Sequence, residues 1–266
     1  MTSLDTVMTP RALGGGNFEI DIPDGWQQGR GAYGGLSLGA LVRAAVAFEA
    51  TPERRVRAVT AQIAGPVPLG TMRIEVETVR RGAAVTTTRA TLRSGDETLV
   101  HAVVVLGADR AGAPSWQTLA SPAPPAWSAL PAMEIPEGFA PTFTKHFEFR
   151  LTGDVPFSGA RPGGSTSGYL RPRARCELRD DALVVALADV WWSAGATALT
   201  SPRPFATLSF SLDLHGSLAE DPSDAPLYHR ASSSLASDGY MSETRELWSP
   251  DGRLLALNHQ LAAVIK

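Results

Sequence analysis

Apolar and polar residues alternate along several short stretches of the chain, whereas two longer stretches are apolar almost throughout. Alternation with a period of two is typical of a strand with one buried face, and it occurs at 18–22 and again at 143–151. The two apolar stretches, 34–48 and 181–194, have apolar residues on nearly every helical face. This pattern predicts two helices that are surrounded by protein.

After each apolar helix the period of two returns four times. The predicted strands cover 56–65, 72–81, 84–95 and 98–107 in the first half, and 205–216, 226–236, 240–250 and 253–265 in the second. The order of elements is therefore duplicated. It predicts an α+β double hotdog, in which two antiparallel sheets are each wrapped around a long central helix. A Rossmann or α/β-hydrolase sheet fits poorly, because helices do not alternate with single strands.

A proline-rich segment separates the two halves. Residues 111–141 hold seven of the 20 prolines, and proline at that density blocks a regular helix or a central strand. Trp116, Trp127 and Ile135 indicate that the segment packs against folded protein. We therefore expect an N-terminal hotdog at 1–110, a linker at 111–141 and a C-terminal hotdog at 142–266.

Composition and charge narrow the class of protein. The 266 residues are 44% hydrophobic and 19% charged with a net charge of −3, as in ordinary soluble proteins. All basic residues except Lys145 and Lys266 are arginines, a bias that favours a bacterial source, and they form no stripe that would bind nucleic acid. With no leader, no apolar run of about 18 residues and one cysteine, Cys176, we expect a cytoplasmic protein without a membrane span.

Three other features of the sequence suggest functional sites, but their context disfavours each of them. Gly29, Gly31 and Gly34 spell GxGxxG, but no apolar strand runs into them, which disfavours a dinucleotide site. Residues 35–39 spell GxSxG, yet Ser37 lies inside a predicted helix instead of at the end of a central strand. The five histidines show no metal-ligand spacing, so neither a metal nor another cofactor is expected.

Asp189 is the only polar side chain between Leu183 and Trp192. A carboxylate in a buried helix costs several kcal/mol unless it is hydrogen-bonded or partly solvated. It therefore has a functional role or lies on a solvated edge as a structural group. The first helix has no acidic residue at 34–48, so a site of this kind would occur once per chain.

The glycines before the first helix offer a second candidate feature. A glycine-rich loop that opens a helix presents free backbone N–H groups and the positive end of the helix dipole, which suit an anionic group or an oxyanion. Gly34 and Gly35 stand at that position. Tight packing of the loop is the alternative reason for glycine there.

These residues resemble acyl-CoA thioesterases of the thioesterase II type, which are double hotdogs made from one chain. That family has an Asp on the second hotdog helix, a Thr on the following strand and a Gln on the last strand. Here Asp189 stands in ALADVW, Thr207 in FATLSFSLDLH and Gln260 in LNHQLAAV, and AYGGLSLGAL looks like the family's Gly-Gly helix start. Trp191 and Trp192 depart from the family pattern, which bears on substrate choice.

The resemblance implies hydrolysis of an acyl-CoA to free acid and CoA, as in lipid metabolism. Because a thiol leaves readily as thiolate, no strong general acid is needed. Asp189 would act as general base on a water that Thr207 and Gln260 orient, while the Gly34 and Gly35 N–H groups receive the oxyanion. Direct attack by Asp189, through a mixed anhydride, stays open.

Two other functions remain alternatives. A hotdog hydratase or dehydratase uses a His paired with an acid, and neither predicted helix carries a His. A non-catalytic double hotdog would bind acyl-CoA or another lipid without turnover. Thr207 taken alone also suits an ordinary strand, and Gln260 could satisfy a backbone group. Further assembly into a homo-oligomer is compatible with the apolar strands.

Overall fold

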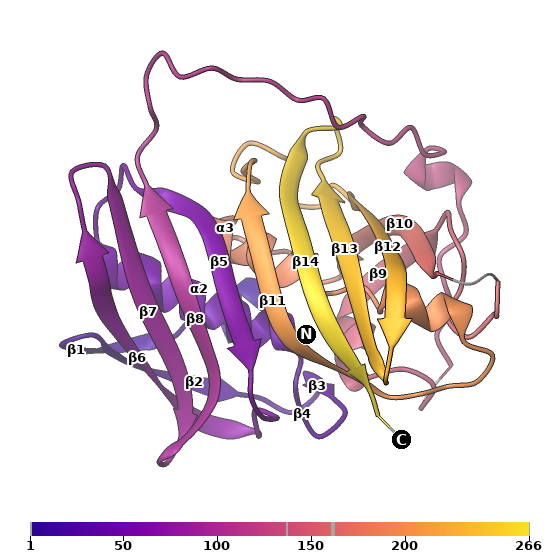
Figure 1. Cartoon of the computed structure of the whole chain (residues 1–266), viewed down its shortest axis with the longest axis horizontal. Coiled ribbons are helices and arrows are strands. Elements are labelled where there is room, and N and C mark those ends of the chain that lie inside the picture. The colour runs from indigo at the N-terminus through magenta and orange to yellow at the C-terminus, as the bar shows by residue number, and fades with distance from the viewer. Residues whose placement is uncertain (1, 137, 161–162, 266) are drawn as a thin grey trace.

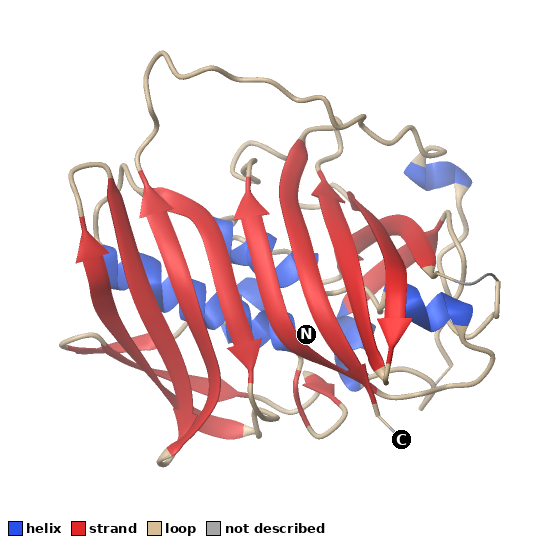
Figure 2. Cartoon of the chain, viewed as in Figure 1, coloured by secondary structure: helices blue, strands red, loops and turns tan. Residues whose placement is uncertain are grey.

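The computed structural model describes residues 2–136, 138–160 and 163–265. Two α-helices lie side by side against one face of a large antiparallel sheet (Figure 1; Figure 2). The helices are α1 (Leu4–Val7), α2 (Gly34–Glu49), α3 (Asp181–Ala188) and the 3-10 helices η1 (Trp127–Ala129), η2 (Thr142–His146) and η3 (Ala194–Ala198). None of the helices in these residues is long and apolar enough to cross a membrane.

The strands of the first half lie close to their predicted bounds, apart from three short ones that were not predicted. They are β1 (Arg11–Gly14), β2 (Asn17–Ile22), β3 (Gln27–Gln28), β4 (Gly31–Ala32), β5 (Arg55–Ile63), β6 (Gly70–Arg81), β7 (Val85–Ser94) and β8 (Glu97–Gly107). The alternation of apolar and polar residues matches the burial of their side chains: in β6 the side chains of Met72, Ile74 and Val76 are buried and those between them are not. The apolar side chains thus face the helices.

The strands of the second half repeat this arrangement. They are β9 (Phe147–Leu151), β10 (Ser165–Pro172), β11 (Phe205–Leu214), β12 (Leu227–Ser237), β13 (Tyr240–Trp248) and β14 (Leu254–Val264). β10 was not predicted, and the predicted strand at 143–151 begins as the 3-10 helix η2 before it becomes β9.

The prediction of two separate sheets is wrong. All strands except β3 and β4 form one 12-stranded sheet in the order β1-β2-β6-β7-β8-β5-β11-β14-β13-β12-β10-β9. The two halves join where β5 pairs with β11, with Ala61 opposite Phe210. Left apart, each of these strands would expose a row of unpaired backbone N–H and C=O groups, so their pairing removes two edges at once.

The predicted helix at 181–194 is also too long. α3 ends at Ala188, and Asp189 is its C-cap, so the second helix has eight residues where a long central helix was expected. Asp, Val and Trp have lower helix propensities than the Ala and Leu before them. Side chains from β13 also take up the backbone groups of the next residues: Arg245 donates to the Trp191 carbonyl, and Glu243 accepts from the Ala194 N–H.

α2 and α3 pack antiparallel at very short range, because α2 presents glycine where the two backbones meet. A Cβ at Gly35 would lie 2.4 Å from the Ala186 carbonyl oxygen, and a Cβ at Gly39 would lie 3.2 Å from that of Ala182. Farther along, the Arg43 guanidinium binds both carboxylate oxygens of Asp180 at 2.9 Å. The contact sets the start of α2 beside the end of α3.

The proline-rich segment crosses over the end of the sheet from β8 to β9 (Figure 1). Arg150 holds it through hydrogen bonds to the carbonyls of Trp127 and Leu130, at 2.7 and 3.0 Å, and its guanidinium stacks 4.1 Å from the Trp127 ring. Ile135 packs against the core. Trp116, in contrast, is 77% exposed, so the expectation that it packs is wrong.

The junction of the two halves makes a stability prediction. Phe210 is fully buried on β11, and Phe210→Ala should lower the free energy of unfolding by about 3–5 kcal/mol because it leaves a cavity in the core. Ser211 is the matched control: it is exposed on the other face of the sheet, and Ser211→Ala should change stability by less than about 0.5 kcal/mol. Equilibrium denaturation in urea measures both, and equal losses would contradict the prediction.

Candidate active site

The carboxylate of Asp189 lies where the end of α3 meets the start of α2. The residue follows the last turn of α3 and is 7% exposed. A Cβ on Gly34 would lie 2.7 Å from its Oδ2, so only glycine leaves room for the carboxylate there. The Gly35 backbone N–H acts on the same carboxylate and lowers its pKa. The negative group thus faces the N–H groups at the positive end of the α2 dipole.

Gln260 and Thr207 extend this contact into a chain of hydrogen bonds. The Gln260 Nε2 donates to Asp189 Oδ1 at 2.9 Å and to Asn258 Oδ1 at 2.9 Å, while its Oε1 accepts from the Thr207 hydroxyl at 3.1 Å. Gln260 is fully buried on β14, and the neighbouring β11 carries Thr207 beside a register shift. The structure therefore brings together all three side chains that the sequence singled out, next to Gly34 and Gly35.

Two charged residues of β13 complete the surroundings of Asp189, and sequence analysis did not single them out as site residues. Arg245 Nη1 lies 3.6 Å from Asp189 Oδ1, and Arg245 Nη2 lies 2.5 Å from Glu243 Oε1. Both side chains are nearly fully buried. A signal was present: Glu243 and Arg245 alternate in phase with Met241 and Leu247, so the apolar face of this strand carries two opposite charges.

The burial of Asp189 governs its electrostatics. Burial raises the pKa of the Asp189 carboxyl above its ordinary value, and the Glu243 charge adds to this rise. Arg245, Gln260 and the Gly35 N–H act in the opposite direction. Arg245 keeps its charge, since Glu243 and Asp189 raise its pKa although burial alone would lower it. The site thus combines a proton-binding carboxyl with a permanent cation.

Buried ring side chains lie near Asp189 and Arg245. Trp191 is 2% exposed, donates from Nε1 to Thr166 Oγ1 at 3.0 Å and stacks on His229, with 5.1 Å between the ring centroids. Burial lowers the pKa of His229 well below its usual range, so the imidazole is neutral. The Tyr33 hydroxyl donates to the Ala186 carbonyl, and burial beside Asp189 raises the pKa of this phenol well above its usual range.

The disfavoured motifs do not assemble into other sites. The GxSxG motif would need an acid and a histidine that follow Ser37 along the chain, and Asp213 and His259 have that order. Ser37 is 1% exposed inside α2, whereas Asp213 and His259 are exposed on strands of the sheet, so these three residues form no triad. Gly31 belongs to the β3–β4 hairpin, where a Cβ would lie 2.7 Å from the Val67 backbone nitrogen. That contact shows tight packing of this loop.

Among the described residues, neither the cysteine nor a group of metal-binding side chains provides an alternative site. Burial raises the pKa of the Cys176 thiol to about 11, which keeps it protonated and unreactive at neutral pH. In the described ranges no three His, Cys, Asp or Glu side chains are grouped to bind a metal.

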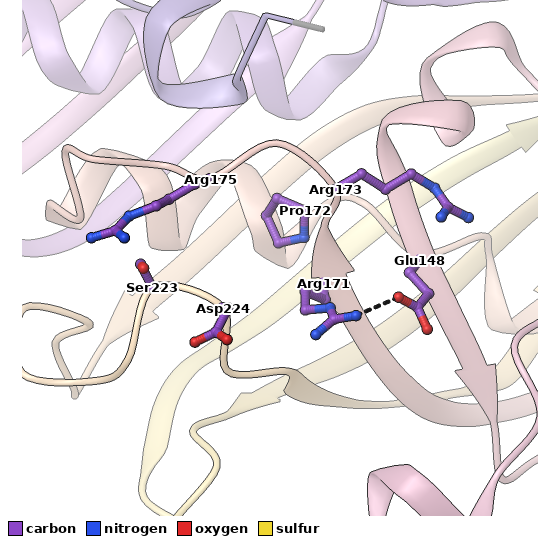
Figure 3. A pocket seen from close by; sticks show the side chains of 7 residues that line it. All are labelled: Glu148, Arg171, Pro172, Arg173, Arg175, Ser223 and Asp224. Carbon is purple, nitrogen blue, oxygen red and sulfur yellow. Dashed lines mark hydrogen bonds and ion pairs between the residues drawn. The ribbon is translucent and has the colours of Figure 1, made fainter.

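A hollow of about 290 Å³ shares no residue with the surroundings of Asp189. It is lined by Glu148, Arg171, Pro172, Arg173, Arg175, Ser223 and Asp224 (Figure 3). One of its two carboxylates is already engaged, because Glu148 is 2.6 Å from Arg171 and 2.8 Å from Arg150. We therefore regard it as an ion-pair network and place the candidate site at Asp189.

Comparison with known protein families identifies both parts of the chain. The family model described as the acyl-CoA thioesterase N-terminal domain matches residues 22–107, and the one described as the acyl-CoA thioesterase C-terminal domain matches residues 113–264. No curated protein matches the chain.

Solved structures with the same fold span the whole chain. A conserved hotdog protein of unknown function from Alicyclobacillus acidocaldarius has 23% identity and a TM-score of 0.86, covering 100% of this chain and 99% of its own. A putative thioesterase II from Thermobifida fusca has 21% identity and a TM-score of 0.84, covering 100% and 98%. An acyl-CoA thioesterase II from Mycobacterium marinum has 16% identity and a TM-score of 0.77, covering 99% and 98%.

The buried carboxyl predicts a pH-dependent stability difference. Because its pKa is raised in the folded state, ionisation of Asp189 costs stability, and this cost grows as the pH rises from the unfolded pKa through the folded one. Asp189→Asn cannot ionise. As the pH rises from about 4, the free energy of unfolding of Asp189→Asn should increase relative to that of the unaltered protein, by about 1.4 kcal/mol for each unit by which folding raises the pKa of Asp189. Denaturation at several pH values measures the difference; a constant or shrinking difference would contradict the prediction.

Proposed function

Because the chain belongs to the family of acyl-CoA thioesterases, we propose that it hydrolyses an acyl-CoA to the free acid and CoA, with Asp189 as the general base. The observation that supports this best is the hydrogen-bond chain from Thr207 through Gln260 to Asp189. Neither an amide nor a hydroxyl can deprotonate water near neutral pH, so Asp189 is the group of the three that can act as base.

The two carboxylate oxygens of Asp189 have different surroundings. Oδ1 is held by Gln260, whose amide is itself fixed by Thr207 and Asn258. Oδ2 faces the start of α2 at Gly34. We assign proton abstraction to Oδ2, because the carboxylate can then accept a proton without breaking the bond that orients it.

The reaction then follows in two steps. The water oxygen bonds to the thioester carbonyl carbon while its proton passes to Asp189, and the carbonyl oxygen becomes an oxyanion. Collapse of this intermediate breaks the C–S bond and releases the thiolate, which takes up a proton from Asp189 or from solvent. We propose that the N–H groups at the start of α2 stabilise the oxyanion. Gly34 is the first candidate, since the Gly35 N–H already serves the carboxylate.

The raised pKa of Asp189 suits this role. A base works best when its pKa lies near the working pH, and a carboxyl at its ordinary value is a weak base. Burial supplies the increase, while Arg245 and Gln260 limit it, because both favour the ionised carboxylate. A hydratase is less well supported, because His229, the histidine in this region, is buried and stacked on Trp191.

The proposal predicts a specific loss of turnover. In an assay of thiol release across short to long acyl-CoAs, Asp189→Asn should lower kcat by about 10²- to 10⁴-fold, the range for removal of a general base. Asp213→Asn is the matched control, because Asp213 is exposed on the face of the sheet away from the helices. Its activity should equal that of the unaltered protein.

The same assay separates the alternatives. Binding of an acyl-CoA by the unaltered protein and by Asp189→Asn, without thiol release from either, would replace the hydrolase with a binding protein. Full turnover in Asp189→Asn would show that another group activates the water.

Base and nucleophile roles of Asp189 predict different labelling. With excess enzyme in ¹⁸O-water, general-base catalysis should place ¹⁸O in the product acid and leave the peptide that contains Asp189 unlabelled and unacylated. Rapid quenching and mass spectrometry of that peptide measure both. An acyl group or ¹⁸O on Asp189 would show that the carboxylate attacks directly.

A further inference from the structure

Beside Asp189 lies a buried ion pair for which the reaction above has no direct use. The Arg245 and Glu243 side chains are 4% and 0% exposed. Two charges so deeply buried are costly to desolvate, and apolar side chains of similar size would often serve stability as well or better. Their presence next to the candidate base therefore calls for a role beyond packing.

Arg245 divides its hydrogen bonds between the ion pair and the segment that follows Asp189. Its Nε and Nη2 bind Glu243 Oε1 at 3.0 and 2.5 Å. Its Nη1 donates to the Trp191 carbonyl at 3.2 Å and lies 3.6 Å from Asp189 Oδ1. The guanidinium thus lies between two carboxylates and fixes the backbone two residues after Asp189.

Glu243 cannot serve as a second base, because both of its oxygens are occupied. Oε1 accepts from Arg245, and Oε2 accepts from the Ser193 hydroxyl at 3.0 Å and the Ala194 N–H at 2.7 Å. Through these bonds Glu243 ties the start of η3 to β13. It also supplies the negative charge that partly neutralises Arg245.

We propose that Arg245 is a positioning residue that holds the Asp189 carboxylate ionised and in place, and that Glu243 tempers this effect by drawing the guanidinium toward itself. The inference rests on the proposed function, in which the ionised carboxylate is the base. Asp189 and Glu243 compete for one cation, and the shorter distance is to Glu243. Removing either partner of the ion pair should therefore act on Asp189 in opposite directions.

The other groups around Asp189 do not obscure this competition. Tyr33 faces it from the start of α2, and burial raises the pKa of that phenol, so it stays neutral. His229 on β12 lies close enough to Arg245 for the cation to lower its pKa further, so it also stays neutral. Gln260 on β14 has no charge. The Asp189 titration then reports on Arg245 and Glu243.

The test is the acid limb of the pH profile of kcat/KM, which is the rise in activity with pH as the base, Asp189, ionises. Arg245→Met should move the limb to higher pH, and the ratio of activity at about pH 5 to that at about pH 8 should fall roughly tenfold, as for a displacement of one unit. Glu243→Gln should move the limb to lower pH. Arg245→Lys keeps a cation, so its limb should lie close to that of the unaltered protein.

A buried arginine elsewhere provides the control. Arg43 is 7% exposed and bound to Asp180, whose side chain is 31% exposed, so Arg43→Met removes the charge of another buried arginine farther along α2. It should lose stability and leave the limb where it is. Limbs that do not move, or that move in the same direction in Arg245→Met and Glu243→Gln, would reduce the pair to a structural role and overturn the proposal.

A second readout separates this inference from the proposed function. The ¹³C chemical shift of the Asp189 carboxyl, assigned with Asp189→Asn, can be followed against pH in the unaltered protein and in each folded variant. If no acyl-CoA is hydrolysed, the proposed function fails, and opposite displacements of this titration would still support the positioning role of Arg245. If Arg245→Met does not fold, Arg245→Gln, which also removes the charge, takes its place; the absence of opposite shifts in Arg245→Gln and Glu243→Gln overturns the proposal.

Discussion

The close antiparallel contact between α2 and α3 is the constraint on which the rest of the structure depends. Gly35 and Gly39 let the backbone of α2 approach the carbonyls of Ala186 and Ala182, because a Cβ at Gly35 would overlap the first carbonyl oxygen and a Cβ at Gly39 would crowd the second. This contact places a carboxylate from one half of the chain at the amino end of a helix from the other. Gly35 therefore belongs both to the helix contact and to the candidate site.

Around that contact the second half of the chain places neutral polar groups next to Asp189 and charged groups farther from it. Neutral hydrogen-bond donors and acceptors from β11 and β14 fix one oxygen of Asp189, while the charges of β13 lie slightly farther away. Aromatic rings and burial keep water from screening these interactions. A site of this kind depends on distances that the single joined sheet maintains, since the sheet holds β11, β13 and β14 in register.

Local sequence patterns predicted most of the secondary structure, because a strand with one buried face has an apolar residue at every second position. They could not show that β5 pairs with β11, since this junction is made by backbone groups that every residue possesses. The end of α3 at Ala188 depends on Arg245 and Glu243, which lie far along the chain. The apolar surroundings of Asp189 singled it out, and the resemblance to a family added Thr207 and Gln260. The charged pair on β13 was not singled out, although both residues lie on the apolar face of that strand.

The joining of two hotdogs through β5 and β11 has a consequence for how such a protein can change over generations. Two identical subunits would have to serve both sides of every shared site with one sequence. A single chain fixes the stoichiometry covalently, so each half can specialise: the first half carries the glycines at Gly34 and Gly35, and the second carries the acid, the amide and the ion pair. A dimer of identical subunits would have two such sites, whereas the single chain has one candidate site whose two sides can vary independently.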